Sequence, residues 1–359
     1  MSPRIRSIVL VAWCAVVLAL PAADASTSRA ISFGGVHLRL PASWPVYDLD
    51  TDPARCVRFD VHAVYLGHGG ESQDCPARAL GKTDAVQVEP LDDRSLSHAM
   101  LEPARLNGIG VYHDPSAGVS GSFVTAVSRA LVTVTHGTDA ATANDILASI
   151  RGSTPSIPVL PAQPVSTSSS EQPSRAPLVA YRYPTMRGFD ACTAPSARAM
   201  RAWLASPYRS VGVYLGGANR ACGDGNLSAS WMTGIERLGW SVVPIYVGLQ
   251  SPCVGQHGLA KIDAHSASSQ GARAASDAVA RARHFGIASG NPIYFDMEAY
   301  RRTATCSRAV LMFLSSWTKT FHSYGYLSGV YGSADSTIRD LSGAYGGSAY
   351  ARPDDVWIA

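Results

Sequence analysis

The second half of the chain alternates short apolar segments with segments in which apolar residues recur three and four positions apart. The first pattern is typical of strands and the second of amphipathic helices. The predicted strands span 188–192, 211–217, 241–250, 292–300, 328–334 and 355–359, and the predicted helices span 195–206, 226–239, 268–286 and 307–325. Gly239, Gly286 and Gly325 stand just before a predicted strand, where a helix commonly ends on glycine. This strand–helix alternation predicts a parallel sheet.

The two faces of these predicted strands differ in character. One face is aliphatic, as in Val211 and Val213, and the other is small, aromatic or acidic; we assign Val243 and Ile245 to the aliphatic face of the third strand. A doubly wound sheet needs apolar residues on both faces, whereas a barrel packs helices against only one. We therefore expect an α/β fold, a (β/α) TIM-type barrel. Only six βα units fit into the sequence, so we expect the barrel to be C-terminally incomplete.

The first half shows short alternating runs at 35–41, 85–91 and 130–136, followed by a helical pattern at 139–150. These runs predict a small α+β domain over residues 31–150. Its histidines have no metal-ligand spacing, and no catalytic pattern is found there. Residues 151–179 are rich in Pro and Ser without apolar periodicity, which predicts a linker that does not pack against either domain. The barrel domain then spans 180–359.

The N-terminus has the pattern of an export signal. Arg4 and Arg6 precede a 14-residue apolar run, and a small-residue motif ends at Ala25. We expect residues 1–25 to be a signal peptide cleaved after Ala25, which leaves no stable membrane span. The predicted location is secreted, extracellular or associated with the cell wall. An uncleaved anchor is the alternative.

Charge and cysteine content bear on the possible partners, disulfides and metal sites of the protein. The net charge of +3 comes without a Lys/Arg run, so a nucleic-acid partner is not expected. An even number of cysteines in an exported chain predicts disulfides, and the absence of C-x-x-C spacing argues against zinc. We expect the pairs Cys56–Cys75, Cys222–Cys253 and Cys192–Cys306.

The candidate chemistry lies in the fourth predicted strand, where Asp296 and Glu298 interrupt an apolar run at spacing i, i+2. This spacing puts both carboxyls on one face of a strand, and Asp190 ends the first strand. Paired carboxyls with aromatic rings are the groups that glycoside hydrolysis uses. The candidate substrate-binding residues on that face are Tyr214, Tyr246, Gln250, Tyr300, Tyr331 and Trp357. Buried structural acids are the alternative; neither a metal nor another cofactor is predicted.

Five segments in this order resemble one family. They are GFDAC at 188–192, YLGG at 214–217, IYVGLQ at 245–250, YFDMEAY at 294–300 and GVYG at 329–332. Together they resemble the glycoside-hydrolase-like domain of unknown function from secreted actinobacterial proteins, which is distantly similar to glycosyl-hydrolase-type lysozymes (muramidases). The resemblance implies a TIM barrel, a link to peptidoglycan, and Glu298 as general acid with Asp296 and Asp190 as further active-site acids.

An apolar surround from Met297, Tyr300 and Tyr331 is expected to keep Glu298 protonated, with Asp296 the more ionised member. The main hypothesis is a secreted hydrolase of cell-wall polysaccharide, peptidoglycan or a related glycan. The alternative is a non-catalytic glycan-binding or wall-associated module on the same scaffold. In a third, weaker hypothesis the first domain docks a partner.

Overall fold

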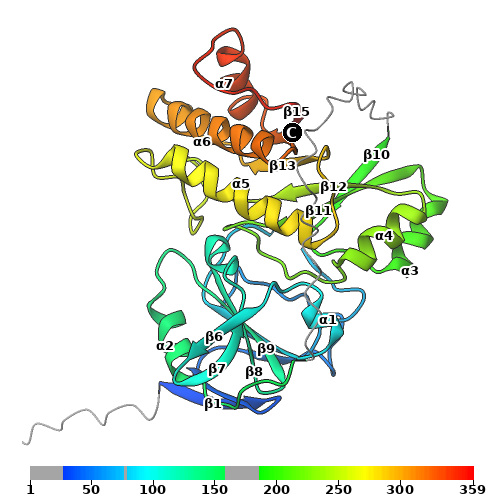
Figure 1. Cartoon of the computed structure of the whole chain (residues 1–359), viewed down its shortest axis with the longest axis vertical. Helices are drawn as coiled ribbons and strands as arrows, with labels where there is room; N and C mark the ends of the chain where they lie inside the picture. Colours follow the sequence, from blue (N-terminus) through cyan, green and yellow to red (C-terminus); the bar gives the residue numbers. More distant parts are fainter. Residues whose placement is uncertain (1–26, 77–78, 158–185) are drawn as a thin grey trace, which may run out of the picture.

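The computed structural model describes residues 27–76, 79–157 and 186–359 (Figure 1). The predicted signal peptide and most of the predicted linker lie outside these residues. No helix within the described ranges is both long and apolar enough to cross a membrane. We call residues 27–157 the N-terminal region and residues 186–359 the C-terminal region.

The N-terminal region contains two sheets. The hairpin β1 (Ser28–Phe33) and β2 (Val36–Pro41) alternates buried and exposed side chains, with Val36, Leu38 and Leu40 facing the core. A seven-stranded mixed sheet has the order β3-β4-β5-β9-β8-β7-β6. Its strands are β3 (Val46–Asp48), β4 (Val64–Leu66), β5 (Ala85–Pro90), β6 (Glu102–Leu106), β7 (Ile109–His113), β8 (Ser122–Val127) and β9 (Ala130–Thr135). The helices are α1 (Asp93–Leu96), η1 (Ala117–Ser120) and α2 (Ala141–Ser149), so the helix predicted at 139–150 is present.

The C-terminal region is built on one parallel sheet of six strands in sequence order. They are β10 (Arg187–Ala191), β11 (Tyr208–Gly216), β12 (Ser241–Tyr246), β13 (Pro292–Met297), β14 (Leu327–Gly332) and β15 (Asp355–Ile358). The connecting helices are α3 (Ala197–Ala202), η2 (Trp203–Ala205), α4 (Ala229–Arg237), α5 (Ala267–His284), α6 (Ala304–Ser323) and α7 (Thr337–Ala344). Hydroxyls of Ser196, Ser228 and Thr303 cap the N-termini of α3, α4 and α6, which satisfies backbone N–H groups that the helix leaves free.

The expected TIM barrel is wrong. The sheet is open, because β10 and β15 are its two edges and do not pair with each other. Closing a barrel of parallel strands takes about eight strands, so six consecutive strands curve only part of the way around. The sequence pattern identified the strand–helix alternation but carried no information on closure.

The helices cover one face of this sheet. We call the opposite face of the sheet the concave face. Phe295 of β13 packs against Phe313 and Trp317 of α6, as the strand pattern predicts. In β12 the predicted faces are inverted: Tyr246 lies in this helix-side core, and Ile245 lies on the concave side beside Gly212. The aliphatic residues of β12 suit either face, so their side-chain type did not reveal the correct one.

The three disulfides use all six expected cysteines. Cys56–Cys75 forms as predicted, but the other two predicted pairs are wrong: the structure joins Cys192 to Cys222 and Cys253 to Cys306. Each observed pair links segments that follow adjacent strands, namely β10 with β11 and β12 with β13. The predicted Cys222–Cys253 pair also joined adjacent strands, so adjacency alone did not select the pairing.

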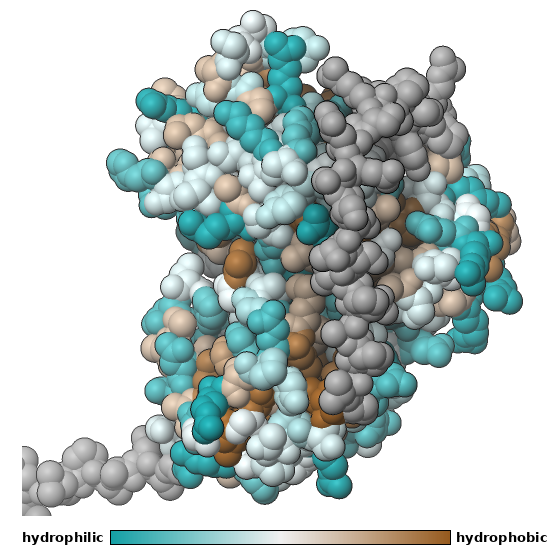
Figure 2. All heavy atoms as spheres, in the orientation of Figure 1, coloured by the Kyte–Doolittle hydropathy of each residue, from teal (hydrophilic) through white to brown (hydrophobic). Residues whose placement is uncertain are grey.

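The two regions are packed together rather than tethered (Figures 1 and 2). The loop after β11 enters the N-terminal region, where Phe59 N donates to Ala221 O at 2.7 Å and Gly81 N donates to Asn219 O at 2.8 Å. The start of the predicted linker also docks, because Ser128 N donates to Ser153 O at 2.8 Å. For residues 151–157 the expectation of an undocked linker is therefore wrong.

This interface predicts the result of cutting the chain. A specific protease site placed between residues 158 and 185 should give two fragments that elute together on size-exclusion chromatography, because the hydrogen bonds between the regions survive the cut. Denaturant should separate them. Two fragments that elute separately in native buffer would contradict this interface.

Candidate active site

Three carboxyl groups lie at or near the C-terminal ends of strands on the concave face. Asp190 is in β10, Asp296 is in β13, and Glu298 follows β13 directly. The Tyr214 hydroxyl of β11 donates to Asp190 Oδ2 at 3.3 Å, which links the first two strands of the site. The charges of Asp190 and Glu298 both act on Asp296, so the structure brings the three predicted acids into one electrostatic cluster.

Asp296 is the buried member of this cluster. Its residue is 4% exposed, and its Oδ1 has no hydrogen-bond partner among the described residues. Burial, followed by the charges of Glu298 and Asp190, raises the pKa of the Asp296 carboxyl well above its ordinary value. The surroundings of Asp296 therefore favour its protonated form, contrary to the expectation that Asp296 is the more ionised of the pair.

Glu298 is half-buried and stands one step nearer the open end of the strand. Its backbone N donates to Gln250 Oε1 at 2.8 Å, and Gln250 Nε2 donates to Asp296 O at 2.9 Å and to Gly248 O at 3.1 Å. Gln250 is fully buried. Its amide is thus engaged with the backbone on both sides of Met297, so it positions the two acids instead of offering a surface for substrate.

Tyr214 is a neutral donor in the cluster. Burial, followed by the charges of Asp296 and Asp190, raises the pKa of its phenol well above the ordinary value. The phenol therefore keeps its proton and can hold the Asp190 carboxylate by donating to it.

Aromatic rings extend the concave face beyond the acids. In the strand register Asp296 lies opposite Tyr331, and Tyr331 lies opposite Trp357. The Trp357 ring meets Tyr331 edge-on at 5.1 Å between centroids and Tyr294 at 6.1 Å. Tyr294 was not among the predicted residues, although its spacing of two from Asp296 places it on the same face. Gly329 makes room for it, since a Cβ there would lie 2.5 Å from the Tyr294 ring.

Two of the predicted aromatic residues do not join this face. Tyr246 is 1% exposed on the helix side, and its hydroxyl donates to Asp277 Oδ2 of α5 at 2.7 Å. Tyr300 is 7% exposed, and its hydroxyl donates to Asp340 Oδ2 of α7 at 2.5 Å, where Arg302 also binds. Through these hydrogen bonds both tyrosines connect the sheet side of the domain to a helix.

One group of residues in the described ranges has the spacing of metal ligands. It consists of Cys56, Cys75 and Cys222, whose sulfur atoms lie within 4.8 Å of one another. All three are in disulfides, and a metal needs the thiolate form. This group therefore does not bind a metal in the oxidised protein.

The raised pKa of Asp296 predicts a measurable effect on stability. The folded state binds more protons than the unfolded state, so the free energy of unfolding falls as pH rises from about 4 through the raised pKa. Asp296→Asn removes this penalty. We expect the variant to melt at a higher temperature than the parent at pH 7, with a difference that shrinks toward pH 4 in calorimetric scans. The exposed Asp335→Asn is the matched control, and a variant no more stable than its parent at pH 7 would overturn the assignment.

Part of the C-terminal region is similar to a known protein family. Residues 201–359 match the family model described as the Rv2525c-like, glycoside hydrolase-like domain. The match covers Asp296 and Glu298, whereas Asp190 lies before it.

No curated protein matches the chain. Among solved structures, the chain is similar to the 1.07 Å crystal structure of an uncharacterized protein from B. stearothermophilus, with 19% identity over 47% of this chain and 72% of that chain and a TM-score of 0.34. A TM-score this low supports no conclusion about the fold. What the comparisons show is therefore the similarity of residues 201–359 to the Rv2525c-like, glycoside hydrolase-like domain.

Proposed function

We propose that this protein is a secreted hydrolase of cell-wall polysaccharide, with peptidoglycan or a related glycan as its substrate. The observation that carries the proposal is a pair of neighbouring carboxyls that differ in burial: Asp296 is 4% exposed, and Glu298 is half-buried and more accessible. Glycoside hydrolysis needs one protonated carboxyl and one carboxylate at the scissile bond. The glycoside hydrolase-like family supports the reaction class, and three disulfides are consistent with an oxidising, extracellular location.

In this proposal Asp296 and Glu298 work as one coupled pair. In the free protein the proton rests on Asp296, because that carboxyl is the more buried. A sugar that covers Glu298 removes water from it and raises its pKa, which moves the proton to Glu298. Glu298 then donates the proton to the leaving glycosidic oxygen, and the ionised Asp296 stabilises the positive charge that develops on the sugar ring.

The remaining residues of the concave face bind the substrate in this proposal. Tyr331 and Trp357 offer ring faces and edges beside the acids, and Tyr214 holds Asp190 as a further carboxylate of the site. Water then attacks the anomeric carbon of the sugar and gives a proton to the ionised acid pair, which completes the hydrolysis and restores the starting protonation state.

The alternative is a glycan-binding module without turnover, favoured by the aromatic face and by how little of Asp296 is exposed. One experiment separates the two. The full-length protein is incubated with purified, insoluble peptidoglycan, and both the bound protein and the released soluble fragments are measured. Hydrolysis releases fragments, whereas a binding module sediments with the glycan and releases none.

A further inference from the structure

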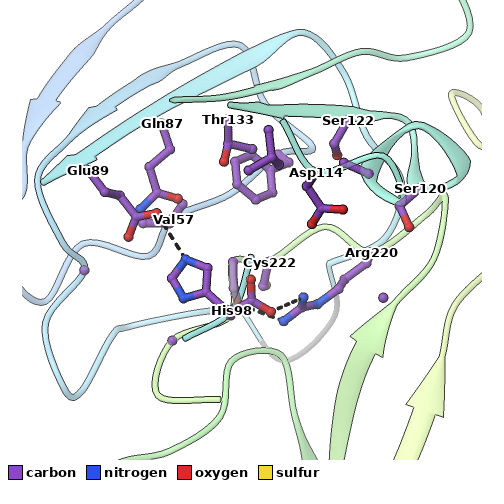
Figure 3. Close-up of a pocket in the computed structure, with 18 of the residues that line it drawn as sticks. Val57, Gln87, Glu89, His98, Asp114, Ser120, Ser122, Thr133, Arg220 and Cys222 are labelled. Atoms are coloured by element: carbon purple, nitrogen blue, oxygen red, sulfur yellow. Dashed lines mark hydrogen bonds and ion pairs between the residues drawn. The ribbon is translucent and has the colours of Figure 1, made fainter. Parts of the chain in front are cut away.

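A polar cavity of about 80 Å³ lies between the two regions (Figure 3). The N-terminal region contributes β5, β8 and the residues around Asp114, and the C-terminal region contributes the loop after β11 and Arg281 of α5. One water needs roughly 10–15 Å³ of such a cavity, so there is room for several waters or for one small oxyanion. It is separate from the concave face that carries Asp296 and Glu298.

Four Lys and Arg side chains line this cavity: Lys82, Arg94, Arg220 and Arg281. Arg94 donates to the backbone carbonyl of Gly69. Arg220 and Arg281 are each 8% exposed. Arg220 Nη1 binds Asp224 Oδ1 at 2.5 Å, but its Nε has no hydrogen-bond partner among the described residues. Arg281 Nε also has no hydrogen-bond partner there. These are two buried N–H donors at the wall of a polar cavity.

Neither Arg281 nor Lys82 has a hydrogen bond to a carboxylate among the described residues. Asp277 Oδ1 lies 3.8 Å from Arg281 Nε, beyond hydrogen-bond distance, and Arg281 Nη2 donates to the neutral Ser116 hydroxyl at 3.2 Å. The Lys82 ammonium donates to Ser120 O, to Ser122 Oγ at 3.1 Å and to Gly217 O at 3.4 Å, which are all uncharged. Burying a charge is costly unless the charge is paired.

Three carboxylates line the cavity, and each is engaged by other groups; Asp224 pairs with Arg220 as described above. Glu89 binds His68 at 3.1 Å and His98 at 3.4 Å. Asp114 accepts from the backbone N of Ser116 at 2.9 Å, from the Ser116 hydroxyl at 2.6 Å, and from the backbone N of Met100 at 3.1 Å. Glu89 and Asp114 therefore do not supply the hydrogen-bonded carboxylate that Arg281 and Lys82 lack. Consistent with this, burial and then the charges of Arg220 and Arg281 lower the pKa of Lys82 to about 7.

We propose that this cavity binds a small tetrahedral oxyanion of the phosphate or sulfate class, held by the Nε donors of Arg220 and Arg281 beside Lys82. Because its walls come from both regions, the bound ion fastens the N-terminal region to the hydrolase-like domain. This inference does not depend on the proposed hydrolysis, and a failure of either leaves the other intact.

Thermal unfolding of the full-length protein tests the site, with inorganic phosphate as the probe against sodium chloride of equal ionic strength. A ligand that binds only the folded state raises the melting temperature as its concentration increases. We expect a saturable rise with phosphate in the parent and loss of that rise in Arg281→Gln. Arg283→Gln, on the exposed side of the same helix, should respond like the parent.

The proposal is overturned if phosphate and chloride give equal melting temperatures in the parent, if Arg281→Gln responds to phosphate as fully as the parent, or if acetate raises the melting temperature and phosphate does not. Crystals of the parent soaked in phosphate provide a second readout that needs no variant. Tetrahedral density between Arg220 and Arg281 supports the site, and density for water alone overturns it.

Discussion

Replacing Glu298 with Gln should lower the rate of glycan hydrolysis by roughly a hundredfold to ten-thousandfold, the range that one general acid contributes. The amide keeps the size of the carboxyl but has no proton acidic enough to be transferred to the leaving oxygen. Binding of the glycan should persist, because the aromatic rings of the concave face are untouched. The rate is measured as reducing ends released from purified peptidoglycan, and binding is measured by sedimentation with the glycan.

The matched control for this variant is Glu236→Gln, the same chemical change on the exposed side of α4. It should hydrolyse the glycan at the parental rate. Full activity in Glu298→Gln would remove Glu298 from the reaction and leave Asp296 as the candidate proton donor.

The largest effect on stability is expected at Trp317 of α6. Its side chain is fully buried, and its ring centroid lies 4.3 Å from that of Phe321, 5.0 Å from that of Phe295 and 5.5 Å from that of Tyr246. Trp317→Ala should lower the free energy of unfolding by about 3–5 kcal/mol, because it removes this packing and leaves a cavity between the helices and the sheet.

Urea unfolding of the two proteins measures the difference. Trp203→Ala is the control, since that residue is 45% exposed. It should lower the free energy of unfolding clearly less than Trp317→Ala does. Equal losses in the two variants would show that the helix-side core does not have the packing described.

The strand–helix units of the C-terminal region could be predicted from sequence, because local patterns determine them. The period of the apolar residues and the glycines at 239, 286 and 325 identified the strand–helix units of the C-terminal region, and these glycines have the positive φ angles expected at helix ends. Barrel closure and the pairing of Cys222 depend on how distant segments meet, which no local pattern records.

The acids of the site were identifiable for the same reason, since two carboxyls in an apolar strand stand out in sequence. The inverted face of Tyr246 was not, because β12 offers suitable residues on both faces and its register against β11 places Ile245 opposite Tyr214. The raised pKa of Asp296 reflects burial in three dimensions, which the sequence does not record. The cavity between the regions could not be predicted from sequence either, since Lys82 and Arg281 are about 200 residues apart in the chain.

The central claim is that this acid pair hydrolyses glycosidic bonds. The most direct measurement is mass spectrometry of the sugars released when the full-length protein acts on purified peptidoglycan in ¹⁸O-labelled water. The proposed function predicts new reducing ends that each carry one ¹⁸O atom, and their loss in a protein with both Asp296→Asn and Glu298→Gln. If the parent releases no more labelled ends than that double variant, the claim of hydrolysis is contradicted.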